Sequence, residues 1–152
     1  MGVVARLEPG AFDPPAELRQ LLESAPGAGA AVSFVGVARG RSKDGEQVDR
    51  LVLEHHPRLT LKSLTDIAEA AATRFAVDHV RVVHRCGEVA PGQPIVFAGA
   101  VSVHRRAAFD AADYLMDRLK TEALLWKREE RPGRSAWIEP AEQDHADRAR
   151  WE

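Results

Sequence analysis

The chain of 152 residues is long enough to bury a hydrophobic core and has the length of one domain. Charged residues make up 29% and hydrophobic residues 45%, a balance typical of a soluble globular protein and not of a disordered one. The formal net charge of −2 argues against a general nucleic-acid binder, because such proteins usually carry a strong positive excess.

In chain order, hydrophobic periodicity and turn residues first predict elements in the N-terminal half of the chain. These are an edge strand at 3–7, a helix that starts at Pro14-Pro15 and includes 16–22, a strand at 30–37, a return strand at 48–54 and an amphipathic helix at 60–75. The polar loop 39–47 is expected to be a flexible hairpin-like connection, in preference to a mobile lid whose Arg39 or Arg41 closes over an anion.

Adjacent histidines at His55 and His56 resemble a metal site at first sight. Neighbouring residues of a strand point to opposite faces, and no cysteine or carboxylate stands at ligand spacing. We therefore expect no metal site.

The C-terminal half continues with alternating strands and helices. The pattern predicts a half-buried strand at 79–85, a turn around 86–93, a central strand at 94–103, a helix after His104, short strands at 124–129 and 136–139, and a polar tail at 141–152 that forms a helix on the body or on a partner. No repeat or domain boundary interrupts this order. The fold class is therefore α+β, a mixed sheet with packed helices in a single domain, 1–152.

The segment 104–129 concentrates cations at both ends of one helix. His104, Arg105 and Arg106 stand at its N-terminus, where free backbone N–H groups and the helix dipole also favour anions. Lys120 and Lys127 follow at the other end, in a chain with seventeen arginines and only four lysines. Because lysine can lose its proton and arginine cannot, the two lysines suggest proton chemistry, although both could equally be ordinary surface residues.

Several common chemistries lack their motifs. The sequence contains no phosphate-binding P-loop, no Gly-x-Gly-x-x-Gly fingerprint, no cysteine pair and no Gly-x-Ser-x-Gly elbow. The single cysteine, Cys86, is read more readily as a small buried residue than as a reactive thiol, and it cannot form an intramolecular disulfide, so a cytoplasmic location is expected. A cationic site for a phosphorylated small molecule remains.

A set of sequence blocks matches a known family in order and spacing. The blocks are Phe34-Val35-Gly36-Val37-Ala38-Arg39, Leu53-Glu54-His55-His56-Pro57, Val83-His84-Arg85-Cys86-Gly87-Glu88, Pro91-Gly92, Ser102-Val103-His104-Arg105, Tyr114-Leu115-Met116-Asp117, Leu119-Lys120-Thr121 and Trp126-Lys127-Arg128-Glu129. Over about residues 29–139 the chain thereby resembles the large, catalytic subunit of molybdopterin synthase, the MoaE family.

The resemblance implies an α/β hammerhead-type fold and a sulfurtransferase activity. Such subunits convert cyclic pyranopterin monophosphate (precursor Z) into molybdopterin by inserting two sulfurs as a dithiolene. The sulfur arrives as a thiocarboxylate on the C-terminal Gly-Gly of a small ubiquitin-like carrier subunit. The family forms a homodimer with one carrier at each end, a heterotetramer, and the resemblance implies no cofactor or metal.

The resemblance also implies the site residues. Arg39, His104, Arg105, Lys120 and Lys127 fall on the family's active-site positions, and its wider substrate-contact segments fall on Val37, Ala38, Arg128 and Glu129. In the resulting hypothesis Arg39, His104 and Arg105 hold the substrate. Their positive charges lower the pKa values of the catalytic pair Lys120 and Lys127, which then transfers protons. Whether each site borrows His104 and Arg105 from the neighbouring subunit stays open.

Some positions depart from the family pattern, and two rival functions remain. His56 stands where Tyr is usual, and the loop 40–47 is variable, so the resemblance gives no role to Arg41 or Lys43. A non-catalytic binding module would use the same cations but tolerate Lys→Arg at both lysines. An RNA-binding domain is disfavoured because aromatic residues are few.

Overall fold

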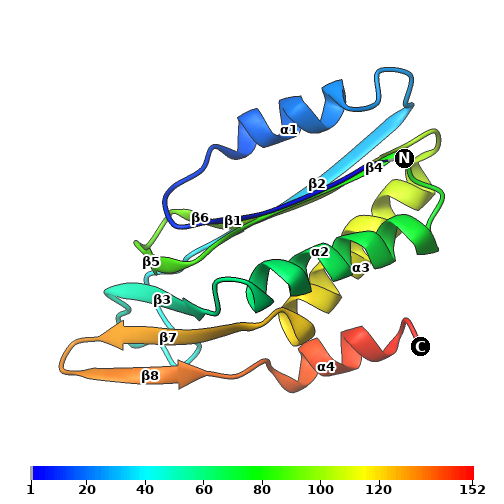
Figure 1. The fold of residues 1–152 in the computed structure, drawn as a ribbon. Helices are drawn as coiled ribbons and strands as arrows, with labels where there is room; N and C mark the ends of the chain where they lie inside the picture. The colour runs from blue at the N-terminus through cyan, green and yellow to red at the C-terminus, as the bar shows by residue number, and fades with distance from the viewer. Residues whose placement is uncertain (1) are drawn as a thin grey trace.

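The computed structural model describes residues 2–152 and contains helices and strands in alternation (Figure 1). The strands are β1 (Gly2–Glu8), β2 (Ala30–Val37), β3 (Arg50–His55), β4 (His79–Arg85), β5 (Gly87–Val89), β6 (Pro94–Ser102), β7 (Leu125–Arg131) and β8 (Arg134–Ile138). The helices are α1 (Pro14–Glu23), α2 (Leu59–Arg74), α3 (Arg105–Glu122) and α4 (Glu142–Ala149). The predicted α+β class is confirmed.

The strands form two four-stranded sheets instead of one. The first sheet has the order β1-β4-β6-β2 and is mixed, because β1 pairs parallel with β4 while the other pairs are antiparallel. The second sheet has the order β5-β3-β7-β8 and is antiparallel throughout. Helix α1 lies on one face of the first sheet, and α2 and α3 lie on the other (Figure 1).

The core of the first sheet follows the alternation of side chains along β4 and β6. Val80 and Val82 point to the cluster built with α2 and α3, whereas Val83 and Phe97 pack with Leu21 of α1. The prediction that 79–85 is half-buried was wrong. All of its residues after His79 are buried, because helices cover both faces of this strand.

A buried ion pair joins α1 to the first sheet. The carboxylate of Glu17 accepts hydrogen bonds at 2.8 Å from Nε of Arg81 and at 2.8 Å and 2.9 Å from the guanidinium of Arg6. Glu17 is only 5% exposed and Arg81 6%. Burial by itself would raise the pKa of Glu17, but the hydrogen bonds from Arg6 and Arg81 outweigh it and lower the pKa below its ordinary value.

The second sheet corrects two sequence predictions. The strand expected at 48–54 lies at Arg50–His55 and pairs with β5 and β7, not with β2, whose only neighbour among the described strands is β6. The chain therefore crosses from one sheet to the other through the loop after β2. Within the predicted turn 86–93 the chain also forms β5, entered through Gly87 at φ +80°, a conformation that favours glycine.

The predicted C-terminal helix is α4, which docks on α3. Trp151 Nε1 donates a hydrogen bond to Asp117 at 2.7 Å, and Arg150 pairs with the same carboxylate at 2.6 Å. The Trp151 ring also packs edge-on against Phe75 and Tyr114. These contacts hold the end of α4 against α3, while Asp144 in the first turn of α4 lines the same pocket as Lys120 at the end of α3.

Candidate active site

A pocket of about 200 Å³ lies where the two sheets meet. Its wall comes from the end of β2, the following loop, the end of α3, one face of β7 and the start of α4. The charged residues that line it are Arg39, Lys43, Lys120, Lys127, Glu129, Glu139 and Asp144.

Lys120 and Lys127 meet in this pocket. Lys120 is exposed in the last turn of α3, and Lys127 is half-buried on β7, opposite Leu53 of β3. Burial, reinforced by the charge of Lys120, lowers the pKa of Lys127 to about 8, against a smaller opposing effect of Asp144. Near neutral pH this amine can therefore give up and regain a proton at little cost.

His84 lies close enough to both lysines for their charges to affect its pKa. The sequence analysis did not identify it as a site residue. It is buried on β4, and its Nδ1 donates a hydrogen bond to the Arg85 carbonyl at 2.8 Å. Burial lowers its pKa to about 4; the hydrogen bond opposes this, and the charges of Lys127 and Lys120 add to the lowering. His84 is thus a neutral residue near the lysines, and its sequence signal was its place in the family-matching block Val83-His84-Arg85-Cys86-Gly87-Glu88.

Four of the other predicted residues lie in the same pocket. Val37, Ala38 and Arg39 reach it from the end of β2, and Glu129 reaches it from β7, where Arg131 holds its carboxylate at 2.6 Å. The backbone of Ala38 is fixed by hydrogen bonds with Gln93 and Gly92. Arg128 is not among the lining residues, because side chains alternate along β7; it contacts Glu54 at 3.0 Å.

His104 and Arg105 are not brought to this pocket within one chain. Both are exposed at the N-terminus of α3, and at 1.5 Å per residue the helix places Arg105 about 22 Å from Lys120. The predicted crowding of the lysines by these two cations is therefore wrong within the chain. Burial and Lys120 account for the lowered pKa of Lys127 instead.

The described part of the chain offers no candidate site for metal or thiol chemistry. Among residues 2–152 no three His, Cys, Asp or Glu side chains gather as metal ligands. Cys86 is buried, which raises the pKa of its thiol and disfavours the reactive thiolate. Over the same residues, no helix combines the length and apolar character that crossing a membrane requires.

The pocket brings Lys120 and Lys127 together with Arg39 and Lys43, an arrangement that suits an anionic ligand. A family model described as "MoaE protein" matches residues 8–122. The chain is 44% identical over 147 residues to the molybdopterin synthase catalytic subunit of Pseudomonas aeruginosa, with 97% of each chain covered. It is also 44% identical over 123 residues to that of Escherichia coli K12, with 81% of each chain covered.

A solved structure agrees with these relatives. The molybdopterin biosynthesis MoaE protein from Burkholderia ambifaria superposes with a TM-score of 0.81 at 38% identity, covering 99% of this chain and 98% of that one. The chain belongs to the MoaE protein family.

Replacing Lys120 with glutamine should raise the pKa of Lys127 from about 8 part of the way to its ordinary 10.5, because one of the two main causes of the lowering is removed while burial remains. At pH 8 we expect Lys127 to be acylated about threefold to tenfold more slowly in this variant, as followed by mass spectrometry. Lys62, exposed and paired with Asp66, is the internal control and should react equally in both proteins. An unchanged pH profile of Lys127 would contradict the coupling.

Proposed function

We propose that this protein is the catalytic subunit of a molybdopterin synthase. It converts cyclic pyranopterin monophosphate into molybdopterin, taking two sulfurs from the C-terminal thiocarboxylate of a small ubiquitin-like carrier subunit. It works in the cytoplasm as one domain, in a homodimer that binds a carrier at each end. Its relatives are named as catalytic subunits of molybdopterin synthase. These names support the proposed activity and the existence of a second subunit.

The observation that carries the proposal is the meeting of Lys120 and Lys127 in one pocket, with the pKa of Lys127 lowered to about 8. Sulfur insertion requires proton transfers at the substrate and stabilisation of developing negative charge. An amine that is partly neutral beside a charged one can supply both. The sulfur itself needs no thiol here, because it arrives on the carrier, which fits the buried Cys86.

The remaining site residues take substrate-binding roles in this proposal. Val37, Ala38, Arg39 and Glu129 line the pocket and contact the pterin phosphate. His104 and Arg105, exposed and about 22 Å from Lys120 along α3, serve the pocket of a second copy of the chain. Arg128 acts from the opposite face of β7, where it contacts Glu54.

The test is reconstitution. Purified protein is mixed with a thiocarboxylated carrier and precursor Z, and the mixture is assayed for molybdopterin. We expect product that depends on all three components. No product under conditions that support an established synthase would overturn the proposal.

A further inference from the structure

The loop between β2 and β3, residues 39–48, forms part of the pocket rim and carries hydrogen bonds of its own. Ser42 is buried, its hydroxyl bonds the Asp44 carboxylate, and the backbone N–H of Glu46 donates to Ser42 Oγ at 3.1 Å. Backbone hydrogen bonds close the loop between Val48 and Gly40 at 2.9 Å and between Ser42 and Glu46 at 2.9 Å. These hydrogen bonds tie the two sides of the loop together.

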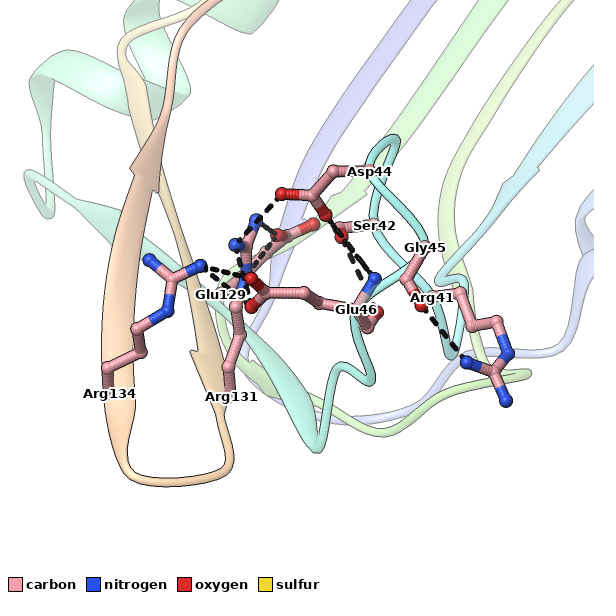
Figure 2. A network of polar contacts seen from close by, with 8 residues as sticks. All are labelled: Arg41, Ser42, Asp44, Gly45, Glu46, Glu129, Arg131 and Arg134. Atoms are coloured by element: carbon pink, nitrogen blue, oxygen red, sulfur yellow. Dashed lines mark hydrogen bonds and ion pairs between the residues drawn. The ribbon is translucent and has the colours of Figure 1, made fainter.

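Ion pairs latch this loop to the β7–β8 hairpin (Figure 2). The Glu46 carboxylate accepts hydrogen bonds at 2.7 Å from Arg134 and at 3.2 Å from Arg131, and Asp44 lies 3.6 Å from Arg131. The Arg131 side chain is only 7% exposed, whereas its partner Glu46 is 45% exposed. Both acidic residues that follow Lys43 in the loop, Asp44 and Glu46, thus contact the hairpin.

Lys43 is a cationic residue of the pocket lining. It is exposed and lines the pocket, whereas Arg41 bonds the Gly45 carbonyl at 3.0 Å and is not among the lining residues. No carboxylate of residues 2–152 forms an ion pair with Lys43, in contrast to Lys62, which pairs with Asp66 at 2.8 Å. An unpaired ammonium group on a fixed loop is prepared to bind an anion.

Lys43 lines the pocket from the loop, whereas Lys120 and Lys127 line it from α3 and β7. Lys127, Glu129 and Arg131 alternate along one face of β7, and the loop is latched at Arg131. Arg131 lies four positions after Lys127 along the strand, a distance of about 13 Å. Because each lysine carries its ammonium on a flexible four-carbon stem, cations from the two sides can both reach one small anion lying between them.

We propose that Lys43 is a further substrate-binding residue, which contacts the phosphate of the pterin substrate from the loop side of the pocket, and that the Glu46 latch to Arg131 and Arg134 holds it in place. This inference rests on the proposed function, which supplies the phosphorylated ligand. It assigns a binding role, not a catalytic one, because the proposed reacting groups are Lys120 and Lys127.

The experiment measures the Kd of the full-length protein for cyclic pyranopterin monophosphate without carrier, so that no turnover occurs. Lys43→Ala should raise this Kd about tenfold, the loss of one charge-assisted contact, and Lys43→Arg should restore it. Glu46→Ala should raise the Kd about threefold, and the double variant should be no weaker than Lys43→Ala alone, because both changes act through one contact. Lys62→Ala, a lysine outside the pocket, is the matched control and should bind as the wild type does.

Turnover with thiocarboxylated carrier completes the test. Lys43→Ala should raise the KM for the pterin and leave kcat and the KM for the carrier unchanged. An unchanged Kd for Lys43→Ala in a protein that makes molybdopterin overturns the role of Lys43 and leaves the proposed function intact, as does an effect confined to the KM for the carrier. The expected Kd changes in a protein that makes no molybdopterin would support the role of Lys43 and refute the activity.

Discussion

Replacing Lys120 with alanine should slow dithiolene formation by about 100-fold to 10,000-fold, the range expected when a general acid–base or charge-stabilising group is removed. Lys120 is exposed at the last turn of α3, so its truncation leaves no cavity in the core. The rate is measured with saturating precursor Z and thiocarboxylated carrier. The urea midpoint of the variant should equal that of the wild type, which separates a chemical defect from unfolding.

Arginine at the same position distinguishes the two roles of Lys120. Lys120→Arg keeps the positive charge but cannot transfer a proton at neutral pH. Activity close to that of the wild type would mean that charge alone is required, whereas a loss as large as that of Lys120→Ala would assign proton transfer to this residue. Lys62→Ala, which removes an exposed lysine on α2, is the control and should be fully active. Near-normal product from Lys120→Ala would refute the catalytic assignment.

Replacing Glu17 with alanine should lower the free energy of unfolding by about 3 to 5 kcal/mol, the cost of leaving a buried charge without its partner. Arg81, 6% exposed, would keep only the hydrogen bond to Gln20 as a side-chain contact, and Arg6 would lose its pairing with α1. Urea denaturation measures the change. Glu23→Ala on the same helix, at an exposed residue without an ion pair in residues 2–152, should cost less than about 0.5 kcal/mol.

The same pair predicts how stability depends on pH. The pKa of Glu17 is lower in the folded chain than its ordinary 4.5. Its contribution is therefore fully present above about pH 4.5 and is lost as the pH falls through the folded pKa. The difference in stability between wild type and Glu17→Ala should shrink below pH 4.5. A difference that stays constant down to pH 3 would contradict this coupling. In a separate test, recovery of stability in the double variant Glu17→Met/Arg81→Met would show that the loss in Glu17→Ala comes from the unpaired charge of Arg81.

Local sequence patterns predicted the elements well. The strands at 30–37 and 79–85 have the predicted ends, the helix at 60–75 is within a residue of both of its predicted ends, and the helix after His104 begins where predicted. Each of these segments carries its own signal, such as Leu64, Ala68 and Ala71 at helical spacing on α2. The division into two sheets was not predictable in this way, because the pairing of β3 with β7 joins residues seventy to eighty positions apart.

The site residues were likewise predictable only in part. Residue types and their order indicated Lys120 and Lys127 and, through the family resemblance, the segment Val37–Arg39, and all of them line the pocket. The sequence assigned no role to Lys43, because nothing local distinguishes it from other charged residues of a polar loop. Its role depends on Glu46 reaching Arg131 and Arg134 in a distant hairpin.

By itself, the sequence determined the α+β class, the family and the presence of a cationic site, since these depend on periodicity, composition and ordered motifs. Only the tertiary structure decided which cations share one pocket. It brought Lys43, Lys120 and Lys127 together from a loop, a helix end and a strand, and it left His104 and Arg105 at the far end of α3. It also buried Lys127 beside Lys120, and this burial, which no local pattern encodes, lowers the pKa of its amine to about 8.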